Sequence, residues 1–349
     1  MKTILVCGGC GFIGSNFVRY LYNKYPDYKL INLDLLTYSG NRDNLADIER
    51  RELGVAESSS RYSFIHGDIG DKNLLEQIFI NEKLDIVVNF AAESHVDRSL
   101  YASYDFIHTN IMGTHALTEE CRRYKIPRFV QISTDEVYGD VPEGYSAEEA
   151  ALNPSNPYAA SKAGADVIIK SYMRSHKLPA LIVRGSNNFG PYQYPEKLIP
   201  LAISNFLDGE KIPIHGSGAH VRHWIYVFDF CNGIDLAIHR GKDYNIYNIG
   251  GVPRTNLQVL ESVRSALNLP HPLDHYKSHT NDRPGADLRY APDTAKSSRE
   301  LGWSLEHDFD SALKSTVQWY LENKNWWGKI KRDKLFIEHY RRQEKADYY

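Results

Sequence analysis

The chain has 349 residues, enough for one large domain or for two domains that share a cleft. Hydrophobic residues make up 42% and charged residues 24%, as in ordinary globular proteins, which excludes extended disorder and fibrous repeats. With 41 basic and 44 acidic residues the net charge is −3, so that nucleic acid and membranes are not expected as partners. The sequence shows no long apolar run, no secretory signal and only four cysteines, which predicts a cytoplasmic protein.

Short apolar segments alternate with longer amphipathic ones from the first residues onward. The expected strands cover residues 3–7, 30–33, 62–66, 86–90, 129–132 and 181–184. The expected helices include residues 12–25, 73–81 and 111–124. Strict alternation of strand and helix favours a parallel sheet that is covered on both faces. The predicted class is α/β, a Rossmann-like doubly wound parallel sheet with a smaller α/β lobe that binds substrate.

The pattern changes after about residue 185, where proline and glycine become denser and strands less regular. We expect a first domain, built on the parallel sheet, in residues 1–185, and segments 225–238 and 244–249 are expected to return to its sheet, so that 225–250 joins this domain. Residues 186–224 and 251–328 are expected to form the smaller lobe. The charged stretch 329–349 is expected to be a solvated helix or a frayed tail.

Glycines at positions 8, 11 and 14 follow the first expected strand and open the first expected helix. In such a turn one glycine permits the tight bend, one lets backbone N–H groups approach a pyrophosphate, and one allows close packing of helix and sheet. Asp34 ends the second strand, twenty residues after Gly14, where a carboxylate accepts hydrogen bonds from ribose hydroxyls. Because no arginine is adjacent to Asp34, the pattern favours NAD over NADP.

Two nearby features have alternative interpretations. Asp68 could reach the adenine edge, or it could be the N-cap of a helix over residues 70–80. Cys7 and Cys10 have the spacing of a metal or redox pair, but neither Cys121 nor Cys231 has a neighbouring cysteine that would complete a zinc site. We therefore expect no metal site, and interpret Cys7 and Cys10 as small buried residues.

Two motifs suggest acid–base chemistry. Tyr158 and Lys162 are four apart and share one face of an expected helix, where the ammonium can lower the pKa of the phenol. Thr134, Asp135 and Glu136 directly follow the strand 129–132, and the carboxyl ends of parallel strands are where α/β sheets hold ligands. An adjacent pair of carboxylates is not needed for hydride transfer, so it indicates a second task, namely the removal of a carbon-bound proton and the protonation of a leaving hydroxyl.

The chain resembles the extended short-chain dehydrogenase/reductase family, and within it the nucleotide-sugar 4,6-dehydratases. The resemblance runs from Gly8 to about Trp326 and rests on the glycine turn and on residues 36–41, 91–99, 133–139, 186–192 and 195–200. Asp135 and Glu136 discriminate most strongly, since the sugar epimerases of this family usually carry small residues there. The resemblance implies tightly bound NAD that is regenerated in each turnover, a nucleotide-sugar substrate and a homodimer joined by the helices near Ile111 and Tyr158.

The implied reaction is the conversion of dTDP-glucose to its 4-keto-6-deoxy product. Tyr158 takes the proton of the C4 hydroxyl with help from Thr134, Glu136 removes the C5 proton, Asp135 protonates the departing C6 hydroxyl, and Lys162 contacts the nicotinamide ribose. The cofactor-binding residues are expected to be Gly8, Gly11, Phe12, Ile13, Gly14, Asp34, Thr37, Asp68, Ile69, Phe90, Ala91, Ala92, Ser94, Thr109, Tyr158, Lys162 and Asn188. The substrate-binding residues are expected to be Ser94, Thr134, Asn187, Lys197, Leu198, Pro213, His215, Arg222, Asn256 and Arg283.

Two positions depart from the family pattern. Arg222 and Trp224 flank His223, where the family usually has aspartate, and Ala286 replaces a histidine of the Asp-Arg-Pro-Gly-His-Asp motif. Both departures concern the expected contacts to the base and the pyrophosphate. The same dehydration of UDP-glucose or of another nucleotide sugar is therefore an alternative, as is 4-epimerisation of a nucleotide sugar.

Overall fold

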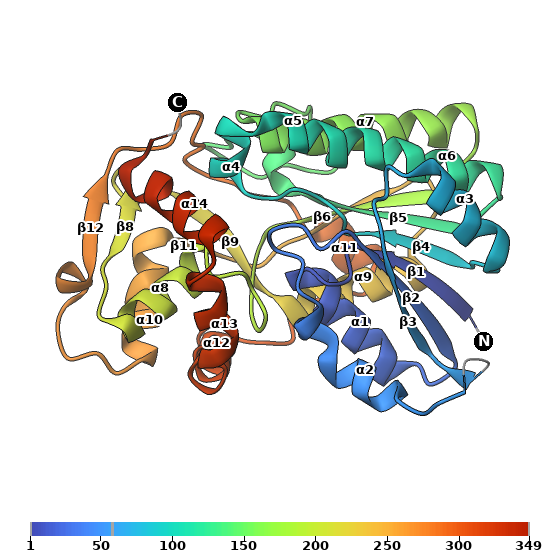
Figure 1. Cartoon of the computed structure of the whole chain (residues 1–349). Helices are drawn as coiled ribbons and strands as arrows, with labels where there is room; N and C mark the ends of the chain where they lie inside the picture. Colours follow the sequence, from blue (N-terminus) through green and yellow to red (C-terminus); the bar gives the residue numbers. More distant parts are fainter. Residues whose placement is uncertain (1, 57–58, 348–349) are drawn as a thin grey trace.

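A parallel sheet of seven strands forms the centre of the larger of two lobes (Figure 1). The computed structural model describes residues 2–56 and 59–347. The strands are paired in the order β10-β6-β5-β4-β1-β2-β3, and every pairing is parallel. They are β1 (Lys2–Cys7), β2 (Tyr28–Asp34), β3 (Tyr62–His66), β4 (Ile86–Asn89), β5 (Arg128–Thr134), β6 (Ala180–Gly185) and β10 (Ile246–Ile249). The predicted α/β class with a parallel Rossmann-like sheet is confirmed.

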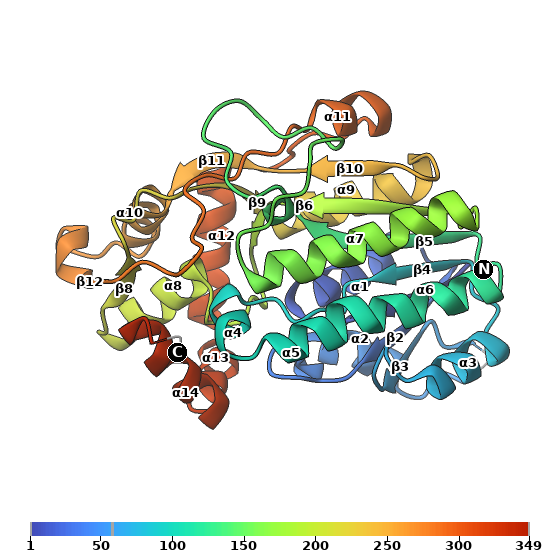
Figure 2. The same cartoon turned by 90° about the horizontal axis from the view of Figure 1, so that it is seen from above.

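Helices cover both faces of this sheet, because alternate strand residues point to opposite sides (Figure 2). One face packs against α1 (Phe12–Lys24), α2 (Ala46–Glu52), α9 (Val227–Arg240) and α11 (Ala295–Leu301). The other face packs against α3 (Lys72–Asn81), α6 (Thr114–Arg123) and α7 (Pro157–Ser175). Shorter elements between them are η1 (Arg42–Leu45), α4 (Val96–Tyr101), α5 (Ser103–Phe106), the π-helix η3 (Ile107–Gly113) and the 3-10 helix η4 (Asp135–Tyr138).

The segment 225–250 differs in part from the expectation. Residues 244–249 do yield a sheet strand, β10, which pairs with β6. Residues 225–238 were expected in the sheet and instead contain the end of β9 and most of α9. Their apolar residues, among them Phe230 and Ile234, lie buried against the sheet face that also carries α1. A helix buried along most of its length shows the same dense apolar run as a buried strand, which explains the error.

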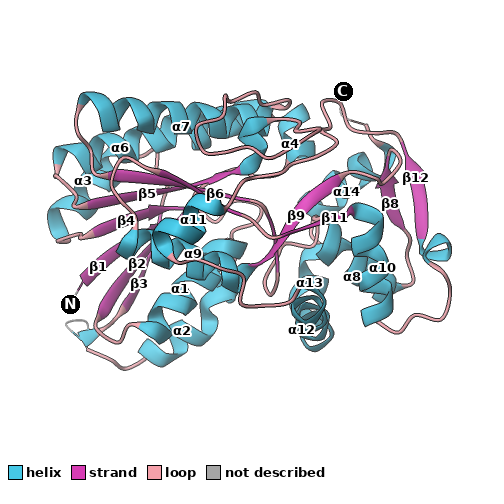
Figure 3. Cartoon of the chain, turned by 180° about the vertical axis from the view of Figure 1, so that it is seen from behind, coloured by secondary structure: helices cyan, strands magenta, loops and turns pink. Residues whose placement is uncertain are grey.

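The smaller lobe lies beside the main sheet (Figure 3) and is built around a second apolar core. A three-stranded sheet has the order β11-β9-β7, with β7 (Asn187–Phe189), β9 (Val221–Tyr226) and β11 (Val252–Thr255). A two-stranded sheet pairs β8 (Ile212–His215) with β12 (Lys277–Thr280). The helical elements of the lobe are α8 (Leu198–Asp208), α10 (Asn256–Ala266), η5 (Leu273–Tyr276), α12 (Phe309–Glu322) and α13 (Lys324–Lys331).

The charged C-terminal stretch is helical, one of the two expected states, but it is neither frayed nor solvated on all sides over its described residues. It forms α14 (Lys334–Lys345), which packs its inner face on the rest of the protein. That face consists of Phe336, His339 and Gln343, all buried. Because two of these three residues are polar, the helix lacks the apolar stripe by which sequence reasoning recognises a packed helix.

No helix among residues 2–56 and 59–347 combines the length and the apolarity that crossing a lipid bilayer requires.

Candidate active site

A cavity of about 300 Å³ lies where residues of the main sheet meet residues of the smaller lobe. Among the expected catalytic residues, Thr134, Asp135, Glu136 and Tyr158 line it, whereas Lys162 does not. All of the expected substrate-binding residues line this same cavity, namely Ser94, Thr134, Asn187, Lys197, Leu198, Pro213, His215, Arg222, Asn256 and Arg283. The expected catalytic residues, apart from Lys162, and the expected substrate-binding residues thus surround the same cavity.

The end of β5 brings the paired carboxylates to this cavity. Thr134 is the last residue of the strand and caps η4, since its Oγ1 accepts a hydrogen bond from the backbone N–H of Glu136 at 3.2 Å. Its hydroxyl also lies 3.4 Å from Oδ1 of Asp135. The following turn ends at Gly139, where φ is +73° and an added Cβ would lie 2.1 Å from the carbonyl oxygen of Asn153. Strand end, cap and glycine together hold both carboxylates in place.

Helix α7 supplies Tyr158 from its first turn. Asn156 caps the helix by accepting a hydrogen bond from the N–H of Ala159 at 2.9 Å, and Pro157 occupies the first helical position. Lys162, one turn later, is buried and donates from Nζ to the carbonyl oxygen of Ile132 at 2.8 Å. Its ammonium is therefore bound to β5, a contact that the sequence pattern did not predict.

Burial controls the protonation of the site. It raises the pKa of Tyr158, and the neighbouring Glu136 raises that pKa further. Burial also raises the pKa of Glu136, and the pKa of Asp135 is raised well above its usual range by burial and by the charge of Glu136. The pKa of Lys162 is lowered to about 8 by burial. The pair therefore favours a protonated Asp135 beside a Glu136 that can ionise.

A buried ion pair between Arg184 and Asp166 contacts the 3-10 helix η4 through Tyr138. Nε of Arg184 lies 2.9 Å from Oδ2 of Asp166, and both side chains are fully buried. Nη1 of Arg184 also donates to the hydroxyl of Tyr138 at 2.7 Å, and that hydroxyl donates to Oδ1 of Asn248 at 2.8 Å. This network connects α7, β6, β10 and the segment that carries the paired carboxylates.

A second cavity, of about 80 Å³, lies at the glycine turn. The expected cofactor residues that line it are Gly8, Gly11, Asp34, Thr37, Asp68, Ile69, Phe90, Ala91, Ala92 and Thr109. Phe12, Ile13, Ser94, Tyr158 and Asn188 line the larger cavity instead. Gly14 and Lys162 line neither cavity. An added Cβ at Gly14 would lie 2.1 Å from the carbonyl oxygen of Gly8, so this glycine serves the close packing of the turn.

These residues fit a dinucleotide. Helix α1 begins after Gly11 without a side-chain cap, so its first N–H groups suit a pyrophosphate. Gly8 has a φ of +78°, and an added Cβ would lie 2.5 Å from the backbone N of Ala91. Asp34 is buried at the end of β2 and accepts hydrogen bonds from the N–H groups of Cys10 and Leu36, both at 2.8 Å, which orient its carboxylate. Each oxygen of a carboxylate retains a second lone pair for a ribose hydroxyl.

Asp68 does not cap the helix that follows it. Its Oδ1 accepts a hydrogen bond from the N–H of Gly70 at 2.7 Å, and the N-cap of α3 is Asp71. Because Asp68 lines the second cavity, the structure places it beside the other expected cofactor residues. The four cysteines are buried and free, and burial raises the pKa of both Cys7 and Cys10, as expected for structural residues.

Three positively charged side chains line the larger cavity, those of Arg222, Lys197 and Arg283. The guanidinium of Arg222 stacks 4.2 Å from the ring centre of Tyr290 and donates to the carbonyl oxygen of Asp287 at 2.8 Å. Nζ of Lys197 donates to the carbonyl oxygen of Ser94 at 2.9 Å. Arg283 forms an ion pair with the buried Asp97. Three cations around one cavity suit an anionic ligand such as a diphosphate.

His223 and Ala286, the two residues that depart from the family pattern, differ in whether they face the larger cavity. His223 lies between Arg222 and Trp224 on β9, and its neighbours line the cavity whereas His223 does not. Strand alternation turns it the other way, where its Nδ1 lies 3.1 Å from the carbonyl oxygen of Gly251. Ala286 does line the cavity. Only the departure at Ala286 therefore changes the surface that a substrate would meet.

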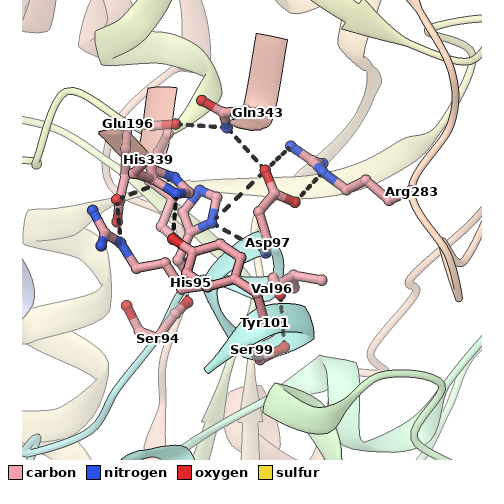
Figure 4. Close-up of polar contacts among 12 residues, drawn as sticks. Ser94, His95, Val96, Asp97, Ser99, Tyr101, Glu196, Arg283, His339 and Gln343 are labelled. Atoms are coloured by element: carbon pink, nitrogen blue, oxygen red, sulfur yellow. Dashed lines mark hydrogen bonds and ion pairs between the residues drawn. The ribbon is translucent and has the colours of Figure 1, made fainter. Parts of the chain in front are cut away.

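Sequence reasoning missed a buried polar cluster beside the cavity (Figure 4). We call His95, Asp97, Glu196, His339 and Gln343 the polar cluster. Of its members, His95, Glu196 and Gln343 line the cavity. His95, Asp97 and Glu196 belong to the motifs that carried the family resemblance, so a search of those motifs for buried polar residues could have found them. His339 and Gln343 lie on α14, and no motif or periodicity in the sequence pointed to them as site residues.

Three members of this cluster, His95, Glu196 and His339, have potential metal-ligating atoms within 4.8 Å of one another. Glu196 is already bound, because Nε of Arg98 lies 3.0 Å from its Oε2. The pKa of His95 is lowered by burial and by the positive charges of Lys197, Arg283 and Arg98. A further cation would be repelled by these charges, so we interpret the group as a network of hydrogen bonds and ion pairs.

The fold and the site define a dinucleotide-binding α/β protein with an acid–base centre at the end of its sheet, and comparison with known proteins agrees. The GDP-mannose 4,6 dehydratase family matches residues 5–316. The chain is 40% identical to the dTDP-glucose 4,6-dehydratase of Escherichia coli over 94% of this chain and 96% of that protein. It is 44% identical to the low-salt glycan biosynthesis protein Agl12 of Haloferax volcanii, over 91% and 98% of the two chains.

Among solved structures, the dTDP-glucose 4,6-dehydratase of Streptomyces venezuelae with NAD and TYD bound has a TM-score of 0.87 and 43% identity. The match covers 95% of this chain and 100% of that one. The chain belongs to the nucleotide-sugar 4,6-dehydratase family, in the branch of the dTDP-glucose 4,6-dehydratases. The family resemblance expected from the sequence motifs is confirmed.

Proposed function

We propose that this protein is an NAD-dependent hydro-lyase that converts dTDP-glucose to dTDP-4-keto-6-deoxyglucose. The observation that carries the proposal is the meeting of Asp135 and Glu136 with Tyr158 and Thr134 around one cavity. An epimerase has to oxidise and reduce a single carbon, for which a tyrosine suffices. A dehydratase must also remove one proton from carbon and add another to a leaving hydroxyl, and two carboxylates meet this need.

The first half of the reaction is oxidation at C4. Tyr158 takes the proton of the C4 hydroxyl in its ionised form, tyrosinate, and Thr134 binds the same substrate oxygen. Against the effect of burial, which raises the pKa of Tyr158, a hydrogen bond with Thr134 lowers that pKa and so favours the ionised form. NAD bound at the glycine turn would supply the hydride acceptor for C4 and the hydride donor for C6, and a proton would return to C5 as the hydride reaches C6, so that no net redox change occurs. The burial of Tyr158 excludes water from the developing ketone.

The second half is elimination of water across C5 and C6. The C4 ketone makes the C5 proton acidic, and Glu136 removes it as a general base. Asp135 protonates the C6 hydroxyl as it departs, because hydroxide is a poor leaving group. The burial and the neighbouring Glu136 that raise the pKa of Asp135 keep its acidic proton in place for this step.

The nucleotide end of the substrate is bound in the part of the cavity lined by the smaller lobe. Arg222, Lys197 and Arg283 bind the diphosphate, and Asn187 and Asn256 supply further hydrogen bonds. We assign residues 1–185 and 225–250, together with α11, to a cofactor domain, and residues 186–224 and the rest of 251–328 to a substrate lobe. Both contribute to the cavity, so substrate and cofactor meet between them.

The test is incubation of purified protein with dTDP-glucose, UDP-glucose and CDP-glucose side by side. We expect a product lighter by one water from dTDP-glucose, detected by mass spectrometry. Deuterium placed at C4 should be recovered at C6. Preference for UDP-glucose would reassign the base, which Ala286 could permit. A product that keeps its C6 oxygen, or loss of the isotope to solvent, would refute the dehydratase mechanism.

We further propose a cytoplasmic homodimer. The elements α5, η3 and α6 follow one another without a break and lie beside α7 on one face of the molecule (Figure 2). Large apolar side chains are exposed on this face, among them Tyr104, Ile107, Met112 and Val167. Burial of these residues against a second copy would remove an apolar patch from water. Buried free cysteines are compatible with a reducing compartment.

A further inference from the structure

The amide of Gln343 joins two separate supports of the substrate cavity. The residue lies on α14, is 3% exposed and lines the cavity. Its Nε2 donates to Oδ2 of Asp97 at 3.1 Å and to the carbonyl oxygen of Glu196 at 3.3 Å (Figure 4). An amide nitrogen has two hydrogens, and here both have acceptors, one on α4 and one in the segment before α8.

The first support, Asp97, fixes the plane of Arg283. Oδ1 of Asp97 lies 2.5 Å from Nε of Arg283, and Nη2 of Arg283 donates to Oδ2 at 3.2 Å. Asp97 is fully buried, whereas the Arg283 side chain is 30% exposed and lines the cavity. A two-point contact with a carboxylate fixes the orientation of a guanidinium, which a single contact does not. Gln343 holds the oxygen that receives Nη2, so it helps to set this orientation.

The second support is the backbone of Glu196, which directly precedes Lys197. Lys197 lines the cavity and bonds to the carbonyl oxygen of Ser94. The side chain of Glu196 is held independently, by Arg98 at 3.0 Å and near Nε2 of His339 at 3.6 Å. His339 lies one turn before Gln343 on the same face of α14 and is joined to the hydroxyl of Tyr101 at 2.9 Å. The helix that carries Gln343 is thus fastened at a second point.

The charge of the residue at position 343 matters as much as its length. A neutral amide can donate to Asp97 without competing with Arg283 for that carboxylate. A glutamate of the same shape would lose both donors and place a second anion beside Asp97. The geometry therefore requires an uncharged donor at this position.

We propose that Gln343 is a positioning residue that orients Arg283 and Lys197 toward the diphosphate of the nucleotide-sugar substrate. The inference rests on the proposed function, since it assumes that these cations bind the diphosphate. It assigns to α14 a share in substrate affinity, and it leaves the chemistry at Tyr158, Asp135 and Glu136 unchanged. Gln343 acts through its neighbours, so its effect must appear in binding rather than in the chemical steps.

The test measures kcat, KM and the affinity for dTDP in Gln343→Ala and Gln343→Glu. We expect KM and the dissociation constant of dTDP to rise about tenfold in Gln343→Ala and more in Gln343→Glu, while kcat changes less than about threefold. The matched controls are Glu344→Ala, at the adjacent exposed position of α14, and Gln318→Glu, an exposed glutamine on α12. Both controls should behave as wild type. Melting temperature and NAD content separate a binding defect from general loss of structure.

A double-mutant cycle with Arg283→Ala tests the route of the effect. Since Gln343 acts through Arg283 as well as through Lys197, the losses of dTDP affinity in Gln343→Ala and Arg283→Ala should add less than fully in the double variant. Unchanged dTDP affinity in Gln343→Glu, or losses that add fully in the double variant, would overturn the inference. A wild-type protein that binds no dTDP and no UDP would instead contradict the proposed function itself.

Discussion

Lys162 binds the carbonyl oxygen of Ile132, two residues before Thr134, and so fastens α7 to the end of β5. The Tyr158 side chain from the helix and the Asp135–Glu136 pair after the strand are thereby held around one cavity. Lys162 therefore contributes to the arrangement of the site although it does not line the cavity. The relative placement of base, acid and phenol is what the following predictions test.

Replacing Glu136 by glutamine should abolish removal of the C5 proton. The amide keeps the shape of the side chain but cannot accept the proton, and general-base removal commonly costs two to four orders of magnitude, about 10²–10⁴-fold. Turnover should fall by this amount. Solvent deuterium should no longer enter C5, as followed by NMR. Exchange at the wild-type rate would show that another group is the base.

The rate should depend on pH with two limbs. Glu136 acts ionised, so activity is lost as pH falls through its pKa, which burial raises above the ordinary value of about 4.3. Asp135 acts protonated, so activity is lost as pH rises through the raised pKa of the pair. The profile of kcat between about pH 5 and about pH 9 measures both limbs. An acid limb at the ordinary value for glutamate would contradict the assignment.

Removing Asp166 should destabilise the fold strongly. The Asp166→Ala variant would leave the guanidinium of Arg184 buried without its counter-charge, which costs about 3–5 kcal/mol. Denaturation by urea measures the loss. Glu338→Ala, which breaks the exposed ion pair with Lys334, is the control and should cost less than about 1 kcal/mol. Equal losses in both variants would show that burial of the pair contributes nothing.

The stability contribution of His239 should decrease with rising pH. Its pKa is raised, first by the hydrogen bond to Asp235 at 3.0 Å. The contribution is therefore complete below the unfolded pKa of about 6.5 and is lost as pH rises through the folded value. The melting temperatures of wild type and His239→Gln should differ more near pH 5.5 than near pH 8.5, by about 2 °C. A difference that is independent of pH would contradict this.

Introducing a charge on the apolar helical face should dissociate the proposed dimer. Val167 is 57% exposed on α7, and a glutamate there would have to be buried without a partner in the interface. Light scattering coupled to size-exclusion chromatography should show a monomer for Val167→Glu. Ile80→Glu, at an exposed site on α3, is the control and should remain dimeric. A wild-type protein that runs as a monomer would refute the proposal.

The sequence was sufficient for the main sheet, because its strands are short apolar runs that end in recognisable turns. Strands β1 to β6 lie within two residues of the predicted bounds at each end. Glycines 8, 11 and 14 could be interpreted in advance since the turn has a steric reason for each. The placement of Asp135 and Glu136 at the cavity followed from their position directly after a parallel strand.

The remainder depended on tertiary contacts that leave no periodic trace. Helix α9 was interpreted as sheet, because a helix buried on most sides shows the same dense apolar run as a buried strand. The inner face of α14 contains His339 and Gln343, which acquire meaning only beside Glu196 and Asp97. The bond from Lys162 to the carbonyl oxygen of Ile132 was not foreseen either, since four-residue spacing shows a shared helix face but not which acceptor the ammonium selects.

Helix α14 lies C-terminal in sequence to every strand of the main sheet, yet it closes part of the cavity wall. During synthesis the sheet and the glycine turn can therefore assemble before α14 has emerged from the ribosome. A nascent or prematurely terminated chain could fold its dinucleotide site, but its substrate cavity would lack Gln343 and the rest of α14. Tight binding of the substrate is therefore expected only after α14 has been synthesised and has packed against the cavity.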